Sequence, residues 1–201
     1  MVYILMKQKS FRKMDVVVIF NGLGNQMSQY AFYLKKKAIN SNTEFITFCN
    51  DHNGLELDKV FKIDCKNTIH KKLLYLIFRI LLTEKLKAII MPVKFILRLF
   101  GCRIIRENFN YNYNSNFLKS SKGLNFYYGG WHSDLYFQSE KKNIFKKYNF
   151  VDAHLNTTNT KILDLINKTN SISFHIRRGI FMIKEKVIPY RHIQNVDIEQ
   201  P

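Results

Sequence analysis

An apolar run, a glycine-containing turn and a helical pattern follow one another near the start of the chain. Residues 15–20, DVVVIF, are mostly β-branched and apolar, which is typical of a buried strand. The next stretch, NGLGNQ, contains Gly22 and Gly24 and predicts a tight turn. Apolar residues then recur at helical spacing between Met27 and Leu34. Strand, turn and helix in this order predict the opening of an α/β unit.

The same alternation continues beyond the first helix. EFITFC at 44–49 predicts a second strand, which completes a right-handed β–α–β unit. The long apolar and basic segment 71–99 predicts helices packed on a sheet, with a break or kink at Pro92. CRIIRE at 102–107 predicts a third strand, and the polar segment 110–121 predicts a loop.

Two further strand patterns occupy the second half of the chain. Residues 125–138, NFYYGGWHSDLYFQ, predict a strand, a glycine break and a helix start capped by Ser133 or Asp134. TKILDLINKT at 160–169 predicts a helix, and SISFHI at 171–176 predicts the strand after it. Helices alternating with apolar strands predict the α/β class with a largely parallel sheet.

The net charge of the chain favours anionic partners but does not identify one of them. The chain of 201 residues is 46% hydrophobic, enough to fold, and its formal net charge is +17. This excess favours nucleic acid, an anionic membrane face or a phosphorylated substrate. The segment 71–99 has a second interpretation, a basic amphipathic surface that contacts anionic lipid. The chain contains no helix-turn-helix, zinc-finger or RNA-recognition motif, so nucleic acid is not expected as a partner.

The cysteines and the N-terminus indicate an intracellular chain. Cys49, Cys65 and Cys102 form no CxxC pair and no zinc-ligand spacing, so reduced and mostly buried thiols are expected. The first residues lack the order of a signal peptide, and Met14 is an alternative start. No run of the sequence is long and apolar enough to span a bilayer. We expect a cytoplasmic protein, or one peripheral to the inner face of the membrane.

Chemistry enters at the glycine turn and at a histidine–arginine motif. Gly22, Gly24, Asn25 and Gln26 could form a ligand loop at a helix N-terminus, or simply a structural turn, because the pattern is neither GxGxxG nor a Walker motif. Aromatic rings in YYGGWHSD, residues 127–134, could line a sugar site or pack in the core.

The histidine–arginine motif, HIRRG, closes the strand predicted at 171–176. Arg177 and Arg178 could hold a phosphate bidentately at the end of that strand, or form a solvated pair, and His175 alone would be an ordinary core histidine. Gly179 suits a strand end, where both arginines could serve one ligand.

These segments together resemble glycosyltransferase family 11, which contains α-1,2-fucosyltransferases. The resemblance runs from about Val16 to Gly179 through GLGNQMSQYAF, DHNGLELDKVFKI, YYGGWHSDLYF and SISFHIRRG, in the family's order. It implies a GT-B architecture with two Rossmann-like halves. Residues 14–160 would form the N-terminal, acceptor-side domain, and residues 161–201 would begin a second, donor-nucleotide-binding half that is incomplete.

The resemblance also implies a reaction and its residues. L-Fucose would pass from GDP-fucose to the 2-hydroxyl of a terminal galactoside on an oligosaccharide, with inversion and without a metal ion or other cofactor. Arg177 would be catalytic on the diphosphate, with Arg178 and His175 supporting the donor. The family's glycine motif would contact the same donor, and in this chain it comprises Gly22, Gly24, Asn25 and Gln26.

The chain departs from the family after the arginine pair. Ile180 stands where relatives have aspartate, and the tail to residue 201 no longer resembles them. We therefore expect a truncated copy with little or no activity, unless a longer protein exists. No general base stands out, and Glu56, Asp58 and Asp134 are candidates by residue type only. The alternative function is a basic protein that binds nucleic acid or a membrane surface without catalysis.

Overall fold

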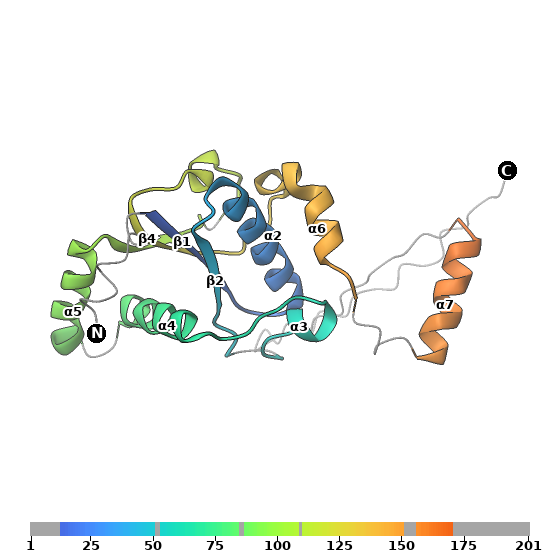
Figure 1. The fold of residues 1–201 in the computed structure, drawn as a ribbon, viewed down its shortest axis with the longest axis horizontal. Helices are drawn as coiled ribbons and strands as arrows, with labels where there is room; N and C mark the ends of the chain where they lie inside the picture. The colour runs from blue at the N-terminus through green and yellow to red at the C-terminus, as the bar shows by residue number, and fades with distance from the viewer. Residues whose placement is uncertain (1–12, 51–52, 85–86, 109, 151–155, 171–201) are drawn as a thin grey trace, which may run out of the picture. The chain divides into compact units, whose positions relative to one another are not determined.

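A computed structural model describes residues 13–50, 53–84, 87–108, 110–150 and 156–170 (Figure 1). The chain divides into two compact units, Met1–His154 and Leu155–Pro201. Helix α7, Thr157–Lys168, belongs to the second unit and confirms the helix predicted there, three residues early. The Asn156 side chain caps α7 by accepting a hydrogen bond from the backbone N–H of Asn159 at 2.8 Å. The strand predicted at 171–176 lies outside the described residues.

The first unit contains a parallel sheet of four strands. They are β1 (Lys13–Ile19), β2 (Thr43–Thr47), β3 (Cys102–Arg106) and β4 (Gly123–Tyr128), in the order β2-β1-β4-β3. All neighbours pair in parallel, so every strand ends at the same edge of the sheet. The α/β class is confirmed, and the sheet with its helices is of the Rossmann-like kind.

Side chains alternate between two cores on the two faces of the sheet. Val17 packs with Phe32 under α2 (Leu23–Ile39), whereas Val16 and Val18 pack with residues of α4 (Ile69–Leu82). A strand places successive side chains on opposite faces, and apolar residues at every position therefore mean that both faces are covered. Figure 1 shows α2 and α4 on either side of the strands.

Of the break or kink predicted at Pro92, the break is wrong, because it lies between α4 and the following helix instead. A kink at Pro92 stays a prediction. Helix α4 ends at Leu82, where the hydroxyl of Thr83 donates to the Arg79 carbonyl at 2.7 Å. Helix α5 (Lys87–Leu99) then continues across Pro92. Pro92 is the sixth residue of α5 and removes one hydrogen bond of the helix, and its side chain is exposed.

Short elements complete the first unit. The predicted loop at 110–121 contains one 3-10 turn, and Ser133 occupies the cap position of another without a side-chain cap hydrogen bond. These elements are α3 (Leu57–Val60), η2 (Ser115–Leu118), η3 (Asp134–Tyr136), η4 (Gln138–Glu140) and α6 (Lys141–Lys147).

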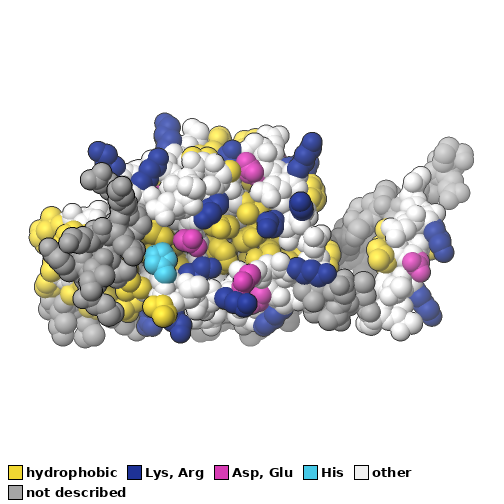
Figure 2. Space-filling model, viewed as in Figure 1, with side chains coloured by type: hydrophobic (Ala, Val, Ile, Leu, Met, Phe, Trp, Pro, Cys, Tyr) yellow, Lys and Arg dark blue, Asp and Glu magenta, His cyan; other side chains and the backbone are white. Residues whose placement is uncertain are grey.

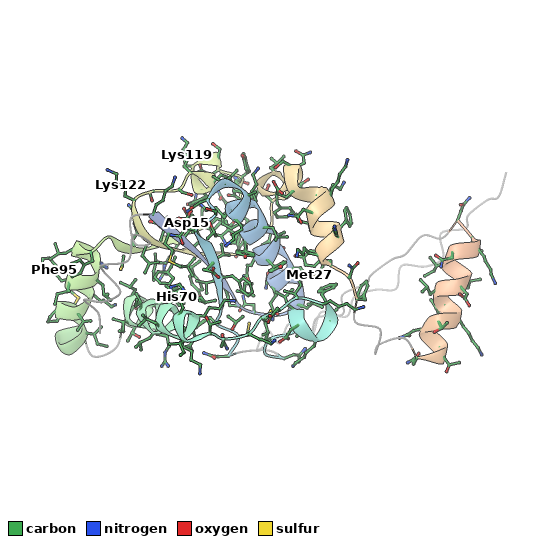
Figure 3. The ribbon with its side chains drawn as sticks, in the orientation of Figure 1. Asp15, Met27, His70, Phe95, Lys119 and Lys122 are labelled. Atoms are coloured by element: carbon green, nitrogen blue, oxygen red, sulfur yellow. The ribbon has the colours of Figure 1, made fainter. Side chains whose placement is uncertain are left out.

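A fully buried ion pair between Asp15 of β1 and Lys36 of α2 lies toward the amino end of the sheet. Lys36 Nζ lies 3.0 Å from the Asp15 carboxylate and 2.9 Å from the Tyr127 hydroxyl, and it also reaches carbonyl oxygens of residues 117–119. Desolvation lowers the pKa of Lys36, and the neighbouring Asp15 opposes this shift. Asp15 is labelled in Figure 3. The network joins β1, α2, β4 and the loop before β4.

Candidate functional site

A pocket of about 360 Å³ opens at the carboxyl ends of β1, β3 and β4. In open α/β sheets ligands bind at this edge, because the loops that follow the strands converge there. The pocket is lined by Phe20 and Asn21 after β1, Asn25 in α2, Arg106, Glu107, Asn108 and Tyr111 around the end of β3, and Tyr128, Gly129, Gly130 and His132 after β4.

The turn after β1 does not depend on its glycines. Asn21 has a φ of 64°, whereas Gly22 has a φ of −76° as the N-cap residue and Gly24 already lies inside α2. The prediction that the two glycines make the tight turn is therefore wrong in detail, because asparagine supplies the left-handed residue. A Cβ added at Gly22 or Gly24 would meet nothing within 4 Å, so both positions leave open space beside the helix N-terminus.

Asn25 and Gln26, which follow Gly24, have different roles in the structure. Asn25 lines the pocket, half-buried. Gln26 is fully buried, and its amide nitrogen donates to the carbonyls of Asn21 at 2.6 Å and Gly54 at 2.8 Å. Its amide oxygen accepts from the backbone N–H of Glu56 at 2.9 Å and of Leu57. The hydrogen bonds of Gln26 are thus made within the protein, and they hold the loop before α3 against the start of α2.

Glu56, a candidate base by type, also has a structural contact. Its carboxylate accepts from the backbone N–H of Leu23 at 3.0 Å, and so satisfies one of the free N–H groups at the start of α2. Asp58 and Asp134 are exposed, and neither lines the pocket. The structure therefore brings Asn25 to the pocket but none of the three predicted acids.

Glu107 is the acid that does line the pocket, and sequence reasoning missed it. One carboxylate oxygen, Oε2, accepts from the backbone N–H of Trp131 at 2.7 Å. The other oxygen, Oε1, is buried without a hydrogen-bond partner within the described chain, as is Trp131 Nε1. A buried acceptor left unpaired is costly, so it marks a position that a ligand hydroxyl or a water would satisfy. The sequence placed Glu107 inside the strand predicted at 102–107, whereas β3 ends at Arg106.

The glycine pair after β4 makes room for these side chains. A Cβ on Gly129 would lie 2.4 Å from Glu107 Cβ, and one on Gly130 would lie 2.4 Å from His132 Nε2. Any side chain at either position would displace a pocket residue. The predicted glycine break is confirmed, with its physical reason in the packing of the pocket.

A second buried amide, that of Gln29, joins two residues of the pocket lining. Gln29 is fully buried, its oxygen accepts from the backbone N–H of Phe20 at 2.9 Å, and its nitrogen donates to the Gly129 carbonyl at 3.1 Å. It thereby ties the end of β1 to the end of β4. A polar residue on the buried face of the predicted helix was the available signal.

Backbone strain gathers at the same place. The non-glycine residues with positive φ in the described ranges are Asn21 at 64°, Tyr111 at 53° and Trp131 at 54°. The first two line the pocket, and Trp131 lies between Gly130 and His132, which also do. Trp131 is held by stacking on Phe32, with ring centroids 4.1 Å apart. Strain of this kind costs about 1–3 kcal/mol per residue and concentrates at functional sites.

Rings and one cation complete the lining. Phe20 and Tyr128 pack with centroids 4.5 Å apart, and Tyr111 meets the His132 ring at 5.4 Å. The Arg106 guanidinium lies 5.9 Å from the Tyr128 ring and makes no hydrogen bond or ion pair with the described part of the chain. Flat rings beside an amide, a cation and a carboxylate suit a hydroxylated ligand that carries negative charge. Of the rings in YYGGWHSD, Tyr127 and Trp131 pack in the core, whereas Tyr128 and His132 line the pocket. That the pocket is a sugar site stays a prediction.

Several predicted residues lie outside the described residues: His175, Arg177, Arg178 and, with them, Ile180. Their prediction as donor-binding or catalytic groups therefore stays a prediction. Within the described ranges, no group of three or more His, Cys, Asp or Glu side chains is placed to hold a metal ion.

The three cysteines are free thiols, as expected. Cys65 and Cys102 are buried and Cys49 is half-buried. Burial raises the pKa of Cys65 to about 12 and those of Cys49 and Cys102 to about 11, so the thiols stay protonated and unreactive at neutral pH.

Comparison of the chain with protein-family models, with curated proteins and with solved structures finds no match. Among the described helices, none has both the length and the hydropathy needed to cross a membrane.

Proposed function

We propose that the chain belongs to an inverting glycosyltransferase of GT-B type, which transfers L-fucose from GDP-fucose to the 2-hydroxyl of a terminal galactoside. The observation that carries this proposal is the pocket at the carboxyl ends of β1, β3 and β4. Its lining includes Asn25 at the start of α2 and Glu107, one carboxylate oxygen of which is buried without a partner among the described residues. The resemblance of the glycine motif and of HIRRG to family 11 supplies the donor and the reaction.

The acceptor sugar would occupy the pocket. Tyr111 and Tyr128 offer ring faces to the sugar, and the Asn25 amide offers a donor and an acceptor to its hydroxyls. Glu107 Oε1 would accept the proton of the reacting 2-hydroxyl, while Oε2 stays bonded to the Trp131 N–H. This assigns the base to a residue that follows a strand and is held by packing on both sides.

The reaction is a single displacement. The galactoside O2 bonds to C1 of fucose as the bond between C1 and the β-phosphate oxygen breaks, and GDP leaves with that electron pair. The proton of the 2-hydroxyl passes to Glu107. Negative charge grows on the diphosphate, and the positive end of α2, with the Gly24 and Asn25 N–H groups, would stabilise it. Arg106 adds a cation to the pocket lining, and the resemblance assigns the same task to Arg177.

The test is GDP release from GDP-fucose in the presence of a methyl β-galactoside. We expect saturable binding of GDP-fucose to the chain as it stands. In a version that continues through a complete donor-binding half, we expect release that depends on the galactoside and disappears with its 2-deoxy analogue. The analogue is the matched control, because it keeps every group except the attacking hydroxyl. Binding of neither GDP nor GDP-fucose would reject the proposal and favour the alternative of a basic binding protein without catalysis.

A further inference from the structure

A second surface, unrelated to the pocket, lies on helix α5. Its exposed apolar residues follow one another around the helix: Met91, Val93, Phe95, Ile96 and Leu99, with Phe100 directly after the helix. At 100° per residue these positions and Pro92 cover about half of the circumference without a charged side chain. Figure 2 shows apolar side chains over α5, and Figure 3 labels Phe95 on it. We call this surface the α5 face.

The α5 face is too apolar for an ordinary solvent-facing helix. Leu97, on the other side of α5, packs against the core beneath α4. Single exposed apolar residues are common on soluble proteins, but a continuous group of six indicates a surface that another phase or molecule covers.

Charge around the α5 face selects the occupant. Helices α4 and α5 contain no Asp or Glu. Lys94 and Arg98 flank the apolar positions of α5, Arg79 lies in the last turn of α4, and Glu84 lies between the two helices. A partner protein with a basic surface would be repelled by these cations. An amphipathic helix with basic residues beside its apolar face is the pattern that binds the interface of an anionic bilayer.

A cavity beside α5 adds a place for a headgroup. It measures about 260 Å³ and is lined by Leu81, Arg98, Arg103, Ile104 and Arg106. Arg103 is bonded to Asn125 and Ser121. The Arg98 guanidinium makes no hydrogen bond or ion pair with the described residues, so it remains available to phosphate oxygens. Arg106 lines this cavity and the pocket alike.

We propose that the α5 face docks on the surface of an anionic phospholipid bilayer, with apolar side chains between the headgroups and Arg98 on a lipid phosphate. The helix lies on the membrane and does not cross it, which agrees with the finding for the described helices. This inference does not depend on the transfer reaction, because the α5 face has no residue in common with the lining of the pocket. The pocket and the cavity beside α5 have only Arg106 in common.

The experiment is co-sedimentation of the full chain with phosphatidylcholine vesicles, with and without phosphatidylglycerol. We expect binding that needs phosphatidylglycerol and weakens with salt. The double variant Phe95→Ser/Leu99→Ser should bind at least about tenfold more weakly. Phe145→Ser/Leu135→Ser is the matched control, since Phe95 and Leu99 are 63% and 69% exposed and Phe145 and Leu135 are 68% and 51% exposed elsewhere.

A charge variant separates the headgroup contact from general attraction. Arg98→Gln should weaken binding to phosphatidylglycerol vesicles about fivefold, and Lys142→Gln, an exposed lysine on α6, should weaken it less. Equal binding by the apolar pair and its control, or no dependence on phosphatidylglycerol, would overturn the proposal. Concentration-dependent dimers that the Phe95→Ser/Leu99→Ser variant abolishes in the absence of vesicles would assign the α5 face to a second copy of the chain instead.

Discussion

At the scale of single residues, Glu107 carries the chemistry assigned to the pocket. Glutamine at this position keeps the shape and an acceptor for the Trp131 N–H, but it cannot take a proton. We expect Glu107→Gln to lower the turnover of galactoside-dependent GDP release by about 100-fold or more, with GDP-fucose affinity unchanged. Asp134→Asn, an exposed acid outside the pocket lining, is the control. Full turnover by Glu107→Gln would remove Glu107 from the role of base.

Gly24 at the start of α2 and Gly129 in the pocket lining differ in what they require, and substitution by alanine distinguishes them. Gly24 has open space at its Cβ and lies in a helix, so Gly24→Ala should raise the free energy of unfolding by up to about 1 kcal/mol. The same methyl group stands where the diphosphate would approach, so GDP-fucose affinity should fall. Gly129→Ala should instead destabilise the fold, because its Cβ would lie 2.4 Å from Glu107 Cβ. Urea unfolding and titration with GDP-fucose measure both. An unchanged affinity in Gly24→Ala would show that this glycine serves no ligand.

At the scale of helices and strands, the buried pair Asp15–Lys36 holds α2 to the sheet. Asp15→Asn leaves the Lys36 ammonium buried without its counter-charge, and we expect a loss of about 3–5 kcal/mol in the free energy of unfolding. Asp64→Asn breaks an exposed pair, Lys66–Asp64, with a distance of 4.0 Å, and should cost under about 1 kcal/mol. Urea denaturation of the two variants gives the comparison. Similar losses in both would mean that the buried pair adds little to the fold.

The local sequence pattern was enough to predict the strands and helices, whereas the residues of the pocket come together through contacts between distant parts of the chain. The run at 15–20 and the spacing after Met27 depend on neighbours in sequence, so β1 and α2 were predictable. Gln29 and Gly129 are 100 residues apart, and no local signal pairs them. Glu107 reaches the pocket only because β3 lies beside β4 in the sheet. Asn25 could be predicted because it follows the strand–turn–helix unit directly.

At the scale of the whole molecule, buried acids of high pKa set an alkaline limit to stability. Burial raises the pKa of the three thiols from 9.0 to about 11 or 12 and that of Tyr30 from 10.0 to about 12. Above pH 9 the unfolded chain therefore loses protons that the folded chain keeps. The unfolded state then binds fewer protons, so the free energy of unfolding falls as pH rises. Lys36 acts in the opposite direction, because its pKa is lowered on folding, but it is one group against several.

We therefore expect stability to be retained below pH 9 and to decline progressively between pH 9 and about 11, the window set by the pKa values of the thiols. Urea midpoints measured across that range provide the test. Cys102→Ala removes one titrating thiol, so its midpoint should decline less steeply with pH than that of the parent chain, even though the variant starts from a lower stability because of the smaller side chain. The quantity to compare between parent and variant is the slope of the urea midpoint against pH, and not the midpoint itself. Parallel slopes in parent and variant would mean that the Cys102 thiol ionises equally well in the folded and unfolded chains, and that burial beneath α4 and α5 does not hold its proton.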